Sequence, residues 1–211
     1  LDVVANAVNW KRYFGTKLAP YIRGDVLEVG AGLGETTRHL CDGRQKSWLC
    51  LEPDARLAQR ARDRFERTKL SPRPVVRVGT LADIDAAARF DAILYIDVLE
   101  HIEHDREELV RASEHLTHGG AVIVLSPAFN VLFSELDRAL GHYRRYTRGS
   151  LAAVFPPTLR RRRLFYLDSV GCAASLANRV LLKQALPSAR QVAFWDGVII
   201  PASRVVDPVL A

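Results

Sequence analysis

The sequence predicts an α/β fold in which a mostly parallel sheet is covered by helices on both faces. The first observation is that short apolar runs alternate with helical patterns along most of the chain, which favours parallel strands joined by helices. The second is that the connections between these segments are short, as in such sheets. The third is a glycine-rich turn at residues 30–34, directly after the first apolar run.

Local signals place each element in order. Residues 5–20 carry aromatic and apolar side chains at helical spacing, and Pro20 ends that segment. We expect strands at 25–29, 48–51, 74–78, 92–96 and 121–125, and helices between them at 35–40, 54–68 and 107–116. Gly119 and Gly120 are expected to end the last of these helices.

After Ser126 the alternation fails. We interpret residues 128–150 as an inserted cap, because this stretch is polar, aromatic and rich in arginine. A helix at 150–155 and a late strand at 164–167 follow, and residues 170–211 are apolar with helical spacing. No repeat or low-complexity linker interrupts the chain, so residues 1–211 are expected to form a single domain.

The composition is that of a globular protein, with 48% hydrophobic and 26% charged residues. The formal net charge of +6 indicates either an anionic partner or simply an arginine-rich composition, and the sequence leaves both open. The three cysteines are odd in number and have no paired spacing, which argues against a disulfide framework and favours a reducing compartment.

These features lead us to expect a cytoplasmic protein. The most apolar stretch, 164–186, contains Asp168, Arg179 and Lys183, which are too many charges for a membrane-spanning helix. Arg160–Arg163 is typical of a solvated patch, and peripheral contact with an acidic inner membrane face stays open.

The glycine turn carries the strongest chemical signal. Its pattern is Glu28-x-Gly30-x-Gly32-x-Gly34, between a strand and the start of a helix, where unpaired backbone N–H groups gather. A dinucleotide site spaces its glycines G-x-G-x-x-G to seat a pyrophosphate. The carboxylate two residues before the first glycine would repel a pyrophosphate, but it suits a ligand with an ammonium and a sulfonium group.

Two acids follow later strands. Glu52 ends the second strand 22 residues after Gly30, where a carboxylate can accept both hydroxyls of a ribose. Asp97 directly follows the fourth strand, in Asp97-Val-Leu-Glu-His101-Ile, and so lies at the carboxyl edge of the sheet, where ligands bind in open α/β folds.

In this order and at these intervals, the three motifs resemble class I S-adenosylmethionine-dependent methyltransferases of the type 11/12-like group, over residues 20–126. The resemblance implies a Rossmann-like sheet of seven mostly parallel strands, S-adenosylmethionine as cofactor and S-adenosylhomocysteine as product. Many relatives carry an acid where this chain has Thr80, and Asp83 is a candidate substitute. The implied cofactor contacts are Tyr13, Glu28, Gly30, Ala31, Gly32, Gly34, Glu52, Pro53, Thr80, Leu81, Asp97 and Val98.

The acceptor side is expected in the cap. Residues 140–146, Leu-Gly-His-Tyr-Arg-Arg-Tyr, resemble an element in a bacterial subset of these enzymes, and the stretch from Arg138 to Arg163 has eight arginines and no acid. Arginine suits bidentate binding of phosphate or carboxylate. We therefore name as substrate-binding candidates Tyr143, Arg144, Arg145 and Tyr146.

Two other interpretations of the cap remain open. The arginine pair could instead brace it against acids of the sheet edge such as Asp97 and Glu100, and nucleic-acid contact is the least favoured use. The partner we expect is a small molecule, anionic or linked to a sugar or lipid.

The expected reaction is methyl transfer to that acceptor, with O-methylation favoured. A hydroxyl acceptor needs a base, for which histidine is the usual choice, and we rank His142 first and His101 second. No metal-ligand cluster stands out in the sequence, so we expect no metal. The alternatives are a non-catalytic S-adenosylmethionine-binding module and, less favoured, an NAD-dependent oxidoreductase.

Overall fold

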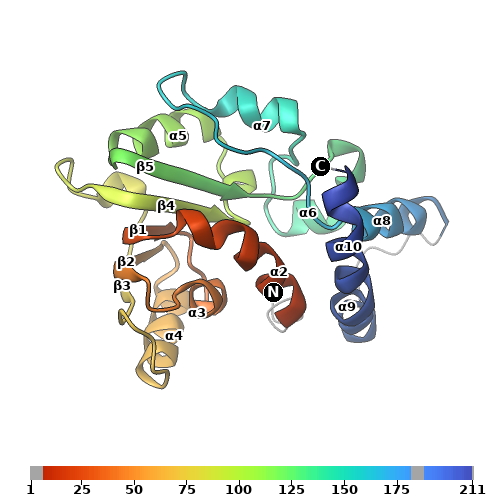
Figure 1. Ribbon diagram of the computed structural model, residues 1–211, viewed down its shortest axis with the longest axis horizontal. Helices are drawn as coiled ribbons and strands as arrows, with labels where there is room; N and C mark the ends of the chain where they lie inside the picture. Colours follow the sequence, from red (N-terminus) through yellow and green to blue (C-terminus); the bar gives the residue numbers. More distant parts are fainter. Residues whose placement is uncertain (1–6, 182–187, 211) are drawn as a thin grey trace.

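The computed structural model describes residues 7–181 and 188–210, and its centre is a sheet of five parallel strands (Figure 1). The strand order is β3-β2-β1-β4-β5, so the first strand lies in the middle. The chain runs outward from β1 to β3, then returns to the other side of β1 to form β4 and β5. The strands are β1 (Gly24–Val29), β2 (Gln45–Glu52), β3 (Val75–Val78), β4 (Phe90–Ile96) and β5 (Leu116–Leu125). All five predicted strands are present, and most are longer than predicted.

Helices connect the strands and continue beyond the sheet. The α-helices are α2 (Val8–Leu18), α3 (Glu35–Leu40), α4 (Ala55–Glu66), α5 (Asp105–Glu114), α6 (Glu135–Ala139), α7 (Arg148–Val154), α8 (Ser169–Leu181), α9 (Ala189–Phe194) and α10 (Ile200–Leu210). Shorter turns are η1 (Ala19–Tyr21), η2 (Leu81–Asp83), η3 (Leu99–His101), η4 (Asn130–Leu132) and the π-helical η5 (Trp195–Ile199). The predictions at residues 5, 6, 182–187 and 211 lie outside the described residues.

The core has two halves because successive residues of each strand point to opposite faces of the sheet. On one face Val26 packs with Phe14 of α2 and Phe65 of α4. On the other face Leu27 packs with Leu109 of α5. Each such fully buried side chain contributes about 1.5–3 kcal/mol by leaving water, and the central strands are therefore held rigidly from both sides.

The sheet has five strands among the described residues, and the expectation of seven was wrong. Residues 164–167, the expected late strand, run without regular structure between α7 and the C-terminal helices (Figure 1). A strand forms only where a neighbouring backbone can pair with it. The chain that follows Asp168 is helical in α8, α9 and α10, so it offers no hairpin partner.

Gly119 and Gly120 do not end a helix, as the sequence analysis expected. The helix α5 ends earlier, at Glu114, and the glycine pair lies inside β5. Gly119 has φ of +78°, and the register between β4 and β5 shifts near this point. Glycine tolerates this conformation because it has no Cβ, and an isolated glycine in a strand often marks such a bulge.

The C-terminal helices dock beside α2 (Figure 1). The hydroxyl of Tyr13 donates to Oδ2 of Asp207 at 2.7 Å, and the indole of Trp195 donates to Oδ2 of Asp168 at the same distance. The Tyr13 bond joins α10 to α2, and the Trp195 bond joins η5 to Asp168, directly before α8. No helix in the described ranges is long and apolar enough to cross a membrane.

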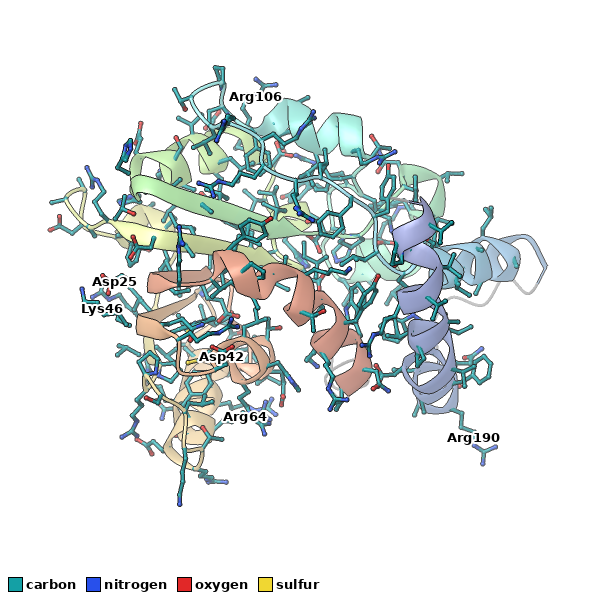
Figure 2. The ribbon with its side chains drawn as sticks, viewed as in Figure 1. Asp25, Asp42, Lys46, Arg64, Arg106 and Arg190 are labelled. Atoms are coloured by element: carbon teal, nitrogen blue, oxygen red, sulfur yellow. The ribbon has the colours of Figure 1, made fainter. Side chains whose placement is uncertain are left out.

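The two ends of the sheet differ in character. At the amino ends of β1 and β2, Lys46 lies close to Asp25 (Figure 2), with 2.9 Å between Nζ and Oδ2. This exposed pair contributes little to stability, because water and salt screen its charges. The carboxyl ends lead into the glycine turn, Glu52 and Asp97, so the candidate site lies at that edge.

Candidate functional site

The glycine turn adopts a conformation that other residues would resist. Gly30, Gly32 and Gly34 have φ of +69°, +56° and +72°, in the left-handed region that favours glycine. A Cβ at Gly30 would lie 2.6 Å from Cγ2 of Val98, and one at Gly34 would lie 2.4 Å from the ring of Phe65. A Cβ at Gly32 would meet nothing within 4 Å. The middle of the turn is therefore open to a ligand, whereas its two ends are packed against protein.

Glu52 lies directly beside this opening. Its Oε2 accepts a hydrogen bond from the backbone N–H of Gly32 at 2.7 Å, and its Oε1 accepts one from the N–H of Asp54 at 3.0 Å. The residue is only 6% exposed. The backbone N–H of Ala31 donates to the carbonyl of Leu51 at 2.9 Å, and this hydrogen bond joins the turn to the end of β2. Pro53 follows on the surface. The carboxylate is thus fixed beside the turn, and its contact with a ribose stays a prediction.

Glu28 is held inside the protein. Its Oε2 accepts hydrogen bonds from the Thr37 hydroxyl at 2.7 Å and from the Trp48 indole at 2.9 Å. Burial raises its pKa to about 7, although these hydrogen bonds oppose the shift. This oxygen already has partners in α3 and β2, so a contact between Glu28 and a cofactor stays a prediction.

Asp97 and Val98 stand at the end of β4, beside the glycine turn. Asp97 is a non-glycine residue with φ of +54°, and its N–H donates to the carbonyl of Leu125 at 2.8 Å. Strained backbone of this kind concentrates at functional sites. Residue Asp97 is exposed at this edge; desolvation raises the pKa of its carboxyl above the ordinary value, and the charge of Lys11 opposes that shift. A carboxylate in this setting favours a cationic ligand.

The remaining cofactor candidates lie in three different settings. Leu81 is fully buried in the core, whereas Thr80 is exposed. Oδ2 of Asp83 accepts from the N–H and the hydroxyl of Thr80 at 2.8 and 3.1 Å, as in a capping box. Tyr13 is 2% exposed and bonded to Asp207 in α10, and its pKa is raised by burial first and by that bond second. Cofactor contacts from these residues stay predictions.

The cap is organised around Asp137 of α6. This carboxylate accepts hydrogen bonds from the N–H and hydroxyl of Ser134, both at 2.8 Å, and from Nε and Nη2 of Arg145 at 2.8 and 2.9 Å. Desolvation raises its pKa, but the bonds from Arg145, Ser134 and His142 outweigh that effect and lower it to about 2. Asp137 is therefore a permanent anion around which the cap folds.

His142 is oriented by the same carboxylate. Its Nδ1 lies 2.9 Å from Oδ1 of Asp137, and the side chain is only 8% exposed. A proton on Nδ1 leaves the lone pair on Nε2. The ring meets His101 edge to face, with 4.5 Å between ring centroids. Burial and the neighbouring imidazole lower the pKa of His101. The structure thus brings together the two histidines that the sequence analysis ranked as bases.

Glu100 lies beside these histidines and is fully buried on η3. Its Oε2 accepts a hydrogen bond from the hydroxyl of Ser126 at 2.8 Å. Burial and the charge of Asp97 raise its pKa to about 8. One ligand atom each from Glu100, His101 and His142 lie within 4.8 Å of one another. These residues meet because the cap folds onto η3, a proximity that the sequence does not reveal, and the expectation of no metal stays a prediction.

Most of the substrate-binding candidates in the cap contact acids of the protein itself and so brace the cap. Arg144 lies 2.6 Å from Oδ2 of Asp105, and the hydroxyl of Tyr146 donates to the same oxygen at 2.7 Å. Arg145 binds Asp137, as described above. Bracing was the open alternative in the sequence, but the acids are Asp105 and Asp137 and not Asp97 or Glu100. Tyr143 differs, because 53% of it is exposed.

Sequence reasoning missed the roles of Asp137 and Asp105, and it treated Glu100 only as a bracing partner. Asp137 belongs to none of the motifs named in the sequence analysis. It lies three residues after Ser134 at the start of α6, and this spacing of a serine and an acid is typical of a helix cap. That signal predicts the turn. It does not predict that His142 and Arg145 converge on the same carboxylate.

The comparisons with known proteins agree with this geometry. Residues 27–122 match the family model described as a methyltransferase domain. This stretch contains the glycine turn, Glu52, Asp97 and Glu100. No curated protein matches the chain.

Solved protein structures share the fold of this chain. A candidate methyltransferase from Bacillus halodurans is 14% identical, with a TM-score of 0.61 over 78% of this chain and 77% of that one. The YcgJ protein from Bacillus subtilis is 15% identical, with a TM-score of 0.59 over 69% of this chain. The chain spans 65% of that protein, less than two thirds of its length.

A third structure is the N-methyltransferase NodS from Bradyrhizobium japonicum in complex with S-adenosyl-L-homocysteine. It is 18% identical, with a TM-score of 0.55 over 71% of this chain and 73% of that one. At such identities the likeness establishes the fold, which is the Rossmann-like fold of S-adenosylmethionine-dependent methyltransferases, here with five strands.

Proposed function

We propose that this protein is an S-adenosylmethionine-dependent methyltransferase that methylates a hydroxyl group of a small-molecule acceptor. The observation that carries the proposal is the open middle of the glycine turn with Glu52 beside it, within a matched methyltransferase domain. The neighbouring NodS structure was solved with S-adenosyl-L-homocysteine, which supports the same cofactor here.

The residues of this edge fit the cofactor's chemical groups. Glu52 accepts the ribose hydroxyls in exchange for its bond to Gly32, and charge-assisted hydrogen bonds of this kind contribute about 1.5–3 kcal/mol each. Asp97 provides a negative charge near the positively charged methionine end. When bound, the cofactor supplies a methyl group on a sulfonium that is already activated for displacement. The protein's own task is to orient the acceptor and to exclude water.

The acceptor hydroxyl must lose its proton, and His142 is the first candidate base. Asp137 holds the imidazole in one orientation and favours a proton on Nδ1, so Nε2 is able to accept. His101 is the second candidate and is adjacent to it. Tyr143 carries an exposed ring on the same segment, suited to stacking on a ring or a sugar face.

The most specific part of this proposal is whether the acceptor is anionic or neutral. Arg144 and Arg145 already bind Asp105 and Asp137, so an anionic acceptor would have to compete with those carboxylates. A neutral hydroxylated acceptor, including a sugar, fits the described contacts without that competition.

A two-stage experiment tests the proposed function. Isothermal titration calorimetry should show binding of S-adenosylhomocysteine and none of NAD. A panel of hydroxylated small molecules, incubated with S-adenosylmethionine, should then yield S-adenosylhomocysteine with at least one acceptor. His142→Ala should lower kcat for that acceptor by about 10²–10⁴-fold, the usual worth of a general base. Binding of NAD alone would reject the proposal, and cofactor binding without turnover on any acceptor would favour a non-catalytic module.

A further inference from the structure

The buried carboxylate of Glu100 lacks a partner for one of its oxygens. Ser126 donates to Oε2, but Oε1 has no hydrogen bond, and no other buried side-chain oxygen or nitrogen is in this position among residues 7–177 and 188–209. An unsatisfied buried polar atom costs about 1–3 kcal/mol, and more for a charged group. The carboxylate of Asp97 adds negative charge nearby. A cation beside Oε1 would give this oxygen a partner and stabilise the ionised form of the carboxyl group.

Two imidazoles stand beside this carboxylate in a suitable arrangement. Asp137 accepts from Nδ1 of His142, so the Nε2 lone pair is available. Metal-binding histidines usually have their other nitrogen bonded to a carboxylate or carbonyl, which fixes the ring. His101 contacts the His142 ring and is exposed, so an ion can reach the group from solvent.

We propose that Glu100, His101 and His142 bind one divalent transition-metal ion. Two imidazoles and one carboxylate suit Zn²⁺, Mn²⁺, Fe²⁺ or Co²⁺ better than Mg²⁺, which prefers oxygen ligands. Atoms that share a zinc ion at about 2.1 Å are no more than about 4.2 Å apart. The three ligand atoms lie within 4.8 Å of one another, so side-chain shifts of about 1 Å close the group around an ion.

Three protein ligands leave a position for substrate, as in catalytic metal sites. If the proposed function holds, the acceptor hydroxyl takes that position. Its O–H bond breaks, the proton leaves to solvent water, and the oxygen keeps its electron pair and stays on the ion, whose charge stabilises it. Both histidines then serve as ligands, and the ion takes over from His142 the activation of the hydroxyl.

Metal binding can be measured without cofactor or acceptor. The protein, free of any polyhistidine tag and treated with a chelator, is titrated with Zn²⁺, Mn²⁺ and Mg²⁺ by calorimetry. We expect one equivalent of Zn²⁺ to bind more tightly than Mg²⁺. Co²⁺ should give a visible absorption band typical of a site with imidazole and carboxylate ligands.

Matched variants locate the ion. Glu100→Gln and His142→Ala should each weaken Zn²⁺ binding at least about 10-fold, and Asp137→Asn should weaken it by about 10–100-fold through loss of the orienting contact. His118→Ala is the control, because His118 is exposed on β5, outside the proposed ligand set, and should bind as wild type. Thermal melting of the apo proteins separates lost ligands from lost folding.

The outcomes separate this inference from the proposed function. Absence of a one-equivalent Zn²⁺ site, or a site unchanged in Glu100→Gln and His142→Ala variants that melt as wild type, overturns the inference. Zn²⁺ binding without any S-adenosylhomocysteine binding would instead leave the metal site standing and reject the methyltransferase.

Discussion

Glu52 accepts a hydrogen bond from the backbone N–H of Gly32, with 2.7 Å between nitrogen and Oε2. The end of one strand is thereby joined to the turn that follows another, across the parallel pair β1 and β2. A residue of the turn and an acid 20 positions later thus define one edge of the candidate cofactor site. The first two predictions concern these two residues.

Replacing Glu52 with Gln should weaken S-adenosylhomocysteine binding by about 1–3 kcal/mol, or roughly 5–150-fold, because charge-assisted bonds to the ribose are lost. Calorimetry measures this directly. Glu66→Gln, at an exposed acid that ends the neighbouring helix α4, is the matched control and should bind as wild type. Equal affinities for the Glu52 variant and wild type would move the ribose contact elsewhere.

Gly32→Val should abolish cofactor binding while the protein stays folded. The added side chain meets no protein atom within 4 Å of its Cβ, so it occupies the space assigned to the cofactor. The left-handed backbone at Gly32 adds a strain of about 1–2 kcal/mol, which lowers the melting temperature by several degrees.

Gly34→Val provides the contrast to this variant. Its Cβ would lie 2.4 Å from the ring of Phe65, so that variant should lose its fold and not merely its ligand. Circular dichroism melts and calorimetry distinguish the two, and retained cofactor binding in Gly32→Val would contradict the steric argument.

Glu28 should make the apo protein less stable as the pH rises. Burial raises its folded pKa to about 7, from an ordinary value of 4.5. Between these values the folded state holds a proton that the unfolded state has released, so stability is lost as pH rises through that window. The full loss is about 3 kcal/mol.

Glu28→Gln cannot ionise and keeps an oxygen that can accept from Thr37 and Trp48. Urea unfolding at pH 5 and pH 8 should therefore show a smaller difference between the two pH values for this variant than for wild type. An identical difference in both proteins would mean that Glu28 does not titrate in this window.

The sequence predicted those parts of the molecule that depend on local patterns. The strands and the glycine turn follow from apolar periodicity and from the backbone needs of glycine, and the acids Glu52 and Asp97 follow from their place after strands. The convergence of His142 and Arg145 on Asp137 depends on how the cap folds back on itself. No sequence pattern specifies that fold.

The strand number shows the same division between local and tertiary information. Residues 164–167 are apolar enough for a strand, but pairing requires a second strand nearby. The C-terminal segment instead docks as helices through contacts such as Tyr13 with Asp207. These residues are 194 positions apart, so no local sequence pattern predicts their contact.

The last prediction separates bracing from acceptor contact within the cap. Arg145→Ala removes two hydrogen bonds from Asp137, which is 1% exposed, and should lower the free energy of unfolding by about 1–3 kcal/mol. Because Asp137 also orients His142, kcat should fall with stability. Tyr143→Ala removes a half-exposed ring and should leave stability within about 0.5 kcal/mol of wild type.

If the Tyr143 ring contacts the acceptor, Tyr143→Ala should raise the acceptor KM while S-adenosylhomocysteine affinity stays constant. Chemical unfolding, calorimetry and steady-state kinetics on both variants give the comparison. A raised acceptor KM in Arg145→Ala at unchanged stability would contradict the bracing role. It would mean that the Arg145 guanidinium binds an anionic acceptor, and that Ser134 and His142 alone hold Asp137. The two variants thus test the braced arginine and the exposed ring against each other on one segment of chain.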